Sequence, residues 1–172
     1  MCIDFEFSTL KPQLLRKLNI VKLDLRRAEH KDYESLQLLV EAYHQFEGVK
    51  LPDEKRNEAI RCLLQKDNHF GGIWLIKQDD LTLGYIAITL GFSLEMGGKD
   101  AFVDEFFLLE SYRGHGFGKQ VLLLAKEIVT GLGAQALHLE IDKRNSKLKQ
   151  LYNDAGFTAR EKYHLMTLKL SD

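Results

Sequence analysis

The sequence predicts an α/β protein in which a mixed β-sheet carries helices on both faces. Three observations support this fold class. Segments of alternating apolar residues mark strands in both halves of the chain, and apolar residues at helical spacing mark four helices between them. A glycine-rich loop joins a strand to a helix in the second half. With 172 residues, of which 45% are hydrophobic, the chain is long enough to bury a sizeable core.

The first half of the chain predicts one strand and two helices. Residues 20–25 alternate and predict the first strand, and a helix is expected from about residue 32 to residue 46, where Gly48 ends it. Pro52-Asp53 opens the second helix. Residues 1–19 form an N-terminal extension to which the pattern assigns no definite element, and residues 20–172 are expected to form one domain.

The remaining elements are three strands, a helix, a strand, a short helix and one or two final strands. The predicted order is β-α-α-β-β-β-α-β-α-β-β, in three α/β/α layers. Turn residues at 78–80 and 97–100 separate the three middle strands. The elements from the fourth onward are expected at about residues 70–77, 83–95, 101–109, 116–131 and 136–141, followed by the short helix that Asn145 opens.

The loop between strand and helix is the most informative segment of the chain. Residues 112–119 read Tyr-Arg-Gly-His-Gly-Phe-Gly-Lys, so glycines alternate at positions 114, 116 and 118. Glycines let the backbone approach a ligand and aim N–H groups at it, and the following helix adds the positive end of its dipole. These features predict an anion site suited to phosphate.

Two common phosphate-binding loops do not fit this segment. A Walker A loop has glycine five residues before its Gly-Lys pair and Ser or Thr after it, whereas Gly118-Lys119 has Arg113 and Gln120 at those positions. A dinucleotide fingerprint has its third glycine three positions after the second, where this chain has Lys119. A nucleotide-binding α/β protein is therefore disfavoured.

The pattern that remains, Arg-x-x-Gly-x-Gly between strand and helix, resembles the acetyl-CoA loop of the GNAT superfamily of N-acetyltransferases. The resemblance runs from about residue 20 to residue 170. It is specific between residues 102 and 157, and its first part, residues 102–118, is most similar to the polyamine and diamine branch. Downstream, the residues that carry it are Asn145, Leu148, Leu151, Tyr152, Gly156 and Phe157.

The resemblance implies acetyl-CoA as the co-substrate and no metal. The pantetheine arm would pair like an added strand with the backbone of Phe106, Phe107 and Leu108, and Asn145 would bond the arm from the other side, unless it is only a helix N-cap. The pyrophosphate would be held by the loop residues Arg113, Gly114, His115, Gly116, Phe117, Gly118 and Lys119. A solvated loop side chain remains the alternative for Arg113 and is the favoured interpretation of the His115 side chain.

The catalytic residues implied are Tyr152, Asp104 and Glu105. Tyr152 would protonate or hydrogen-bond the departing thiolate, with a buried core tyrosine as the alternative. Asp104 ranks before Glu105 as the proton acceptor, and a salt-bridged structural acid is the alternative for either. Since successive strand residues face opposite sides, only one of the two is expected to point into the site unless a bulge intervenes. Tyr43, His44 and Glu47 are candidates for the acceptor cleft.

We therefore expect an N-acetyltransferase that moves an acetyl group directly from acetyl-CoA to a primary amine of a small molecule or peptide. The alternative is a non-catalytic acyl-CoA-binding sensor or interaction module on the same fold. The chain has no obvious acidic cluster for a long polycation, so spermine is not implied. A homodimer remains open.

Composition narrows the partners and the compartment. The net charge of −1 gives no support for nucleic-acid binding, and no apolar run approaches the ~20 residues that span a bilayer. The two cysteines, Cys2 and Cys62, provide neither a disulfide framework nor metal-ligand spacing. The N-terminus lacks the apolar segment of a secretory signal, and these features together favour a cytoplasmic location.

Overall fold

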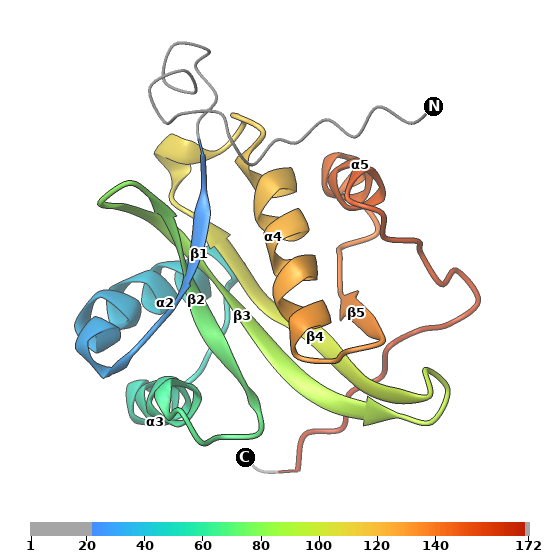
Figure 1. The fold of residues 1–172 in the computed structure, drawn as a ribbon, viewed down its shortest axis with the longest axis horizontal. Helices are drawn as coiled ribbons and strands as arrows, with labels where there is room; N and C mark the ends of the chain where they lie inside the picture. The colour runs from blue at the N-terminus through green and yellow to red at the C-terminus, as the bar shows by residue number, and fades with distance from the viewer. Residues whose placement is uncertain (1–21, 171–172) are drawn as a thin grey trace, which may run out of the picture. The chain divides into compact units, whose positions relative to one another are not determined.

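The computed structural model describes residues 22–170. The N-terminal extension expected at residues 1–19, and the beginning of the first expected strand, lie outside the described residues. The chain divides into two compact units, Met1–Glu140 and Ile141–Asp172, which are described here one by one. Figure 1 shows the helices and strands of both units along the colour ramp of the chain.

The first unit is built on a five-stranded sheet in the order β1-β2-β3-β4-β5. Neighbouring strands are antiparallel except for β4 and β5, which run parallel. The mixed sheet confirms the predicted fold class. The strands are β1 (Asp24–Arg27), β2 (Gly71–Gln78), β3 (Leu81–Ser93), β4 (Gly98–Leu108) and β5 (Ala136–Leu139).

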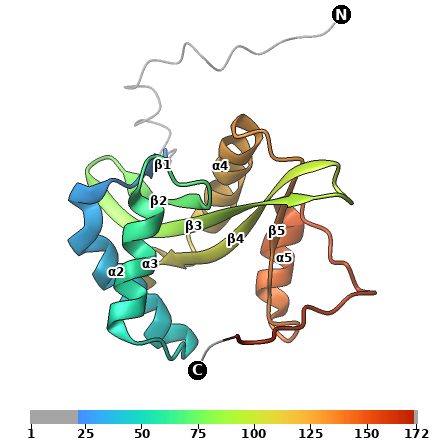
Figure 2. The same cartoon turned by 90° about the horizontal axis from the view of Figure 1, so that it is seen from below.

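Helices cover both faces of this sheet (Figure 2). Helices α2 (Tyr33–Glu47) and α3 (Asp53–Leu64) contribute Leu36 and Ile60 to a core on one face. Helix α4 (Phe117–Gly131) packs on the opposite face, where Val121 and Ala125 are fully buried. We call these faces the α2 face and the α4 face. Together with the sheet they form the three predicted layers.

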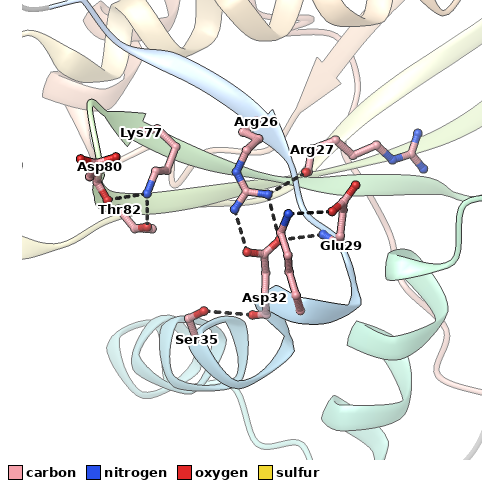
Figure 3. A network of polar contacts seen from close by, with 9 residues as sticks. Arg26, Arg27, Glu29, Asp32, Ser35, Lys77, Asp80 and Thr82 are labelled. Carbon is pink, nitrogen blue, oxygen red and sulfur yellow. Dashed lines mark hydrogen bonds and ion pairs between the residues drawn. The ribbon is translucent and has the colours of Figure 1, made fainter.

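Helix α2 is fastened to β1 at its first turn (Figure 3). A short 3-10 helix, η2 (His30–Asp32), precedes α2. Arg26 donates to both carboxylate oxygens of Asp32, at 3.0 and 2.7 Å, and the backbone N–H of Glu29 donates to the same carboxylate at 2.8 Å. Asp32 is only 8% exposed, whereas 37% of the Arg26 side chain is exposed, so water reaches this bidentate pair mainly from the arginine side; the pair sets where α2 starts relative to the sheet.

Strand β4 contains a bulge at Asp104. Ala87 of β3 pairs with Glu105 and the next residue, Ile88, pairs with Val103, so Asp104 is an extra residue without a partner on β3. Such an extra residue interrupts the alternation of side chains between the two faces. The bulge lies in the segment that carries both predicted proton acceptors.

The second unit contains α5 (Ser146–Asp154), which Asn145 caps by accepting a hydrogen bond of 3.1 Å from the backbone N–H of Leu148. The prediction of one or two final strands was wrong: residues 155–170 contain no strand. An isolated strand leaves its backbone groups unpaired, and no described segment of this unit is a strand that could pair with it.

Candidate active site

The edge of β4 that faces β5 is open over its second half. β5 pairs only with residues 100–103, and no other strand among the described residues pairs with this edge. The N–H of Leu109 donates to the carbonyl of Leu83, so by the alternation of an antiparallel ladder Phe107 is paired with Tyr85. The backbone groups of Phe106 and Leu108 therefore face the open edge, whereas those of Phe107 face β3.

The open edge leads through the 3-10 helix η3 (Glu110–Tyr112) into the glycine loop and α4. Gly114 and Gly116 both have φ of +79°, a left-handed conformation that favours glycine. Gly116 is the N-cap of α4 and has no side chain that could cap the first N–H groups of the helix. The first turn of α4 carries no acidic residue and contains the exposed Lys119. These features suit an anion.

Side chains of the loop are held by contacts within the first unit. Arg113 Nε donates a hydrogen bond of 2.7 Å to the carbonyl of Leu108, and its guanidinium lies 4.4 Å from the ring centre of Phe46 and 5.2 Å from that of Phe107. The rings of His115 and Phe117 are stacked at 5.8 Å. Arg113 thus fastens the start of the loop to the end of β4.

Both predicted proton acceptors emerge on the α2 face. Val103 and Phe106 pack on the α4 face, and the two residues between them are Asp104 and Glu105. Each oxygen of Glu105 has a partner on the α2 face: Nε2 of His44 lies 2.7 Å from Oε1, and the hydroxyl of Tyr85 donates to Oε2 at 2.6 Å. The bulge therefore brings together two carboxylates that strict alternation would have separated.

The electrostatics of this cluster differ between the two acids. Asp104 is exposed as a residue, but neighbouring protein replaces part of the water around its carboxyl. This desolvation, followed by the negative charge of Glu105, raises the pKa of Asp104, while His44 acts in the opposite direction. Burial and the charge of Glu105 also raise the pKa of Tyr85, so its phenol stays protonated and donates. Asp104 is the carboxyl that binds a proton more readily than usual.

Aromatic side chains surround the cluster. Tyr43 meets Tyr85 edge-on at 6.3 Å and Phe107 at 6.0 Å, and His44 is only 7% exposed. Of the residues expected in the acceptor cleft, His44 contacts the carboxylate of Glu105, Tyr43 lies beside His44, and Glu47 is exposed at the end of α2. Sequence reasoning missed Tyr85, because a tyrosine within an apolar strand reads as an ordinary core residue.

The remaining predicted residues lie in the second unit. Asn145 is the N-cap of α5, and Tyr152, in the last turn of that helix, meets Phe157 edge-on at 5.9 Å. The helix and its asparagine cap follow the predicted pattern. Within residues 22–170, no group of three or more His, Cys, Asp or Glu side chains has a geometry that could hold a metal ion.

Comparison with known proteins identifies the family. The model of the acetyltransferase (GNAT) family matches residues 33–157, which include the open edge of β4, the glycine loop and α5. The chain belongs to the GNAT family. Acetyl transfer is the activity of that family, and the resemblance inferred from the loop is confirmed. None of the helices in the described part of this GNAT protein is long and apolar enough to span a membrane.

Individual proteins resemble this chain in sequence or in fold. The integron cassette protein HFX_CASS3, from the mobile metagenome of Cole Harbour Salt Marsh, is 34% identical over 86% of this chain and 91% of its own, with a TM-score of 0.74. The uncharacterized N-acetyltransferase YycN of Bacillus subtilis is 34% identical over 59 residues, which are 34% of this chain and 38% of that relative. The ribosomal-protein-alanine N-acetyltransferase of Brucella melitensis shares the fold at 17% identity, with a TM-score of 0.67 over 87% of this chain and all of its own.

Proposed function

We propose that this GNAT protein transfers the acetyl group of acetyl-CoA directly to a primary amine of a small molecule or peptide. The observation that carries the proposal is the continuous path from the open edge of β4 to the N-terminus of α4. The backbone groups of Phe106 and the N–H of Leu108, which no strand among the described residues pairs, suit an extended arm with amide groups. The uncapped start of α4 suits the pyrophosphate at the other end of that arm.

The acceptor would bind on the α2 face. An ammonium ion suits a site lined by the carboxylates of Asp104 and Glu105, and it must lose a proton before its nitrogen can attack the acetyl carbon. Asp104 is the preferred proton acceptor because its pKa is raised above that of an ordinary aspartate. Glu105, hydrogen-bonded at both oxygens, is the second candidate.

Completion of the reaction requires protonation of the coenzyme A thiolate. Tyr152 is the proposed donor, because in the sequence it matches the tyrosine that performs this step in many GNAT enzymes. Asn145 caps the helix that carries Tyr152 and is proposed to bond the pantetheine arm as well. We further propose that residues 20–172 act as one acetyltransferase domain in the cytoplasm, with no nucleic-acid or membrane partner.

The test is release of free thiol from acetyl-CoA in the presence of a panel of small amines and short peptides, with mass spectrometry of the amine products. We expect thiol release to depend on an amine and to yield the acetylated amine. A thermal shift with acetyl-CoA, recorded in parallel, reports binding alone. Binding of acetyl-CoA without turnover of any amine would favour the sensor alternative over the enzyme.

A further inference from the structure

The carboxylate of Glu105 is held at both oxygens by side chains from two other elements. His44, in the last turn of α2, lies 2.7 Å from Oε1, and Tyr85, on β3, donates to Oε2 at 2.6 Å. Hydrogen bonds of this length to a charged acceptor are stronger than neutral ones. Since the side chain of Glu105 keeps 19% of its surface exposed, the carboxylate is fixed in place without being sealed from a ligand.

The surroundings of His44 determine which ring nitrogen donates to Glu105. An ionised carboxylate only accepts hydrogen bonds, so Nε2 of His44 carries the proton that points to Glu105. Nδ1 is buried and has no hydrogen-bond partner among residues 22–170. Nε2 is therefore the nitrogen through which His44 holds Glu105.

The backbone of His44 is fixed as well. Its carbonyl accepts hydrogen bonds from the N–H groups of Gly48 and Val49, at the point where α2 ends. The other end of α2 is anchored to β1 by the bidentate Arg26–Asp32 pair. The imidazole is therefore presented to Glu105 by a helix that is held at both ends.

We propose that His44 is a positioning residue, whose Nε2–H holds the Glu105 carboxylate in the orientation in which Glu105 binds the cationic acceptor amine. The inference rests on the proposed function, because it requires an amine acceptor on the α2 face. Holding a charged group in one conformation before the ligand arrives lowers the entropic cost of binding. His44 thus acts through Glu105 and does not itself touch the acceptor.

Two substitutions of His44 distinguish the effect of its hydrogen bond to Glu105 from the effect of its imidazole ring. His44→Gln keeps an N–H donor near the position of Nε2 but cannot titrate, and His44→Leu removes the donor. For the best acceptor amine, we expect His44→Leu to raise KM about tenfold, the loss typical of one charge-assisted hydrogen bond, and His44→Gln to raise it less than about threefold. KM for acetyl-CoA should stay near the parental value in both variants.

A matched control comes from the other histidine that faces an acid in this unit. Nε2 of His138 lies 3.6 Å from Asp100, outside the Glu105 cluster, and His138→Gln should leave KM for the amine unchanged. Tyr85→Phe removes the second donor to Glu105 and keeps the ring, so it should also raise KM for the amine. If His44→Leu does not fold, Tyr85→Phe still tests whether the hydrogen bonds to Glu105 support binding of the amine.

A readout independent of activity is the ¹⁵N–¹H spectrum of the histidine rings in the parent protein. We expect the Nε2–H signal of His44 to shift in Glu105→Gln. An Nε2–H signal that is the same in the parent and in Glu105→Gln would overturn the proposal, and so would equal impairment of His44→Gln and His44→Leu. Those results leave the proposed function standing, whereas a parent that acetylates no amine defeats the proposed function itself.

Discussion

Val103 and Phe106, three residues apart on β4, both pack against the α4 face of the sheet. In a regular strand an odd separation places two side chains on opposite faces, so this relationship requires the bulge at Asp104. Asp104 and Glu105 are consequently directed to the α2 face together. Two acids close to each other cannot ionise independently, which contributes to the raised pKa of Asp104.

Asp104→Asn tests the proton acceptor. If Asp104 accepts the proton of the acceptor amine, the substitution should lower kcat about 10²–10⁴-fold at pH 7, the usual contribution of one general base. The loss should be smaller at pH 9, where more of the amine is already neutral. Glu110→Gln, at an exposed acid of η3, controls for the change in charge. Equal losses of kcat at pH 7 and pH 9 would argue for a structural role.

The same variant makes a prediction about stability. A carboxyl whose pKa is raised by folding stabilises the native state in its protonated form, and this contribution is lost as the pH rises through the native pKa. At pH 7, well above the pKa of an unfolded aspartate, the raised native pKa makes the carboxyl of Asp104 a destabilising group. We expect the Tm of Asp104→Asn at pH 7 to equal or exceed that of the parent in a thermal melt. A clearly lower Tm would contradict the direction of the pKa shift.

Gly116→Ala tests the phosphate loop. A methyl group at Gly116 would meet no protein atom within 4 Å, so it would clash only with a bound ligand, although φ of +79° adds a strain of about 1–2 kcal/mol. Gly133, after α4, has φ of +83° and equally open surroundings, so Gly133→Ala carries the same strain away from the loop. Both variants should lose similar stability. Only Gly116→Ala should weaken acetyl-CoA binding, by about tenfold or more, equivalent to about 1.4 kcal/mol.

Calorimetric titration with acetyl-CoA checks the loop directly, and a thermal melt without ligand measures the strain. If the two glycine variants bind acetyl-CoA with the affinity of the parent, the anion site does not lie at the start of α4. A loss of affinity in Gly133→Ala alone would point to the opposite end of that helix.

Tyr152→Phe tests the proposed acid. The substitution keeps the ring that meets Phe157 and removes only the hydroxyl, so folding should be nearly unchanged. Loss of an acid catalyst costs about 10²–10⁴ in rate, which corresponds to roughly 3–5 kcal/mol in the barrier. Single-turnover rates should fall by this factor while acetyl-CoA affinity remains parental. Tyr163→Phe, at an exposed tyrosine of the same unit, is the control, and a parental rate in Tyr152→Phe would exclude it as the acid.

Asp32→Asn tests the anchoring of α2 (Figure 3). The hydrogen bond from Arg26 lowers the pKa of Asp32, so its contribution to stability is present above the unfolded pKa of about 3.9 and is lost as the pH falls through the native value. We expect a loss of about 1–3 kcal/mol in the free energy of unfolding at pH 7, and a smaller difference from the parent at pH 3.

Urea unfolding followed by circular dichroism measures this difference at each pH. Asp53→Asn is the control, because Asp53 is 81% exposed and pairs with Arg56 within the first turn of α3. An exposed pair of this kind contributes about 0–1 kcal/mol. A pH-independent loss in Asp32→Asn would assign the effect to packing rather than to the charge of Asp32.

The sequence by itself was sufficient for the elements whose signals are local. Apolar periodicity predicted α2 and α4 to within one residue at their ends, because the buried face of each helix repeats along the chain, and Pro52-Asp53 marked the start of α3. The alternation of Gly114, Gly116 and Gly118 between strand and helix identified the loop. Left-handed φ at Gly114 and Gly116 agrees with the reason for expecting glycine there. The cap at Asn145 was likewise visible in the sequence.

Only the tertiary structure decided which groups meet at the site. Glu105 is 61 positions from His44 and 20 from Tyr85, and no local pattern predicts which side chains will meet across such distances. The bulge at Asp104 arises from the pairing of β4 with β3. The sequence of β4 alone therefore does not predict that its two acids share a face. The prediction of one or two final strands was wrong for a related reason. Residues 163–170 alternate like a strand, but a strand forms only where another strand offers its hydrogen bonds, and pairing between strands is a property of the fold.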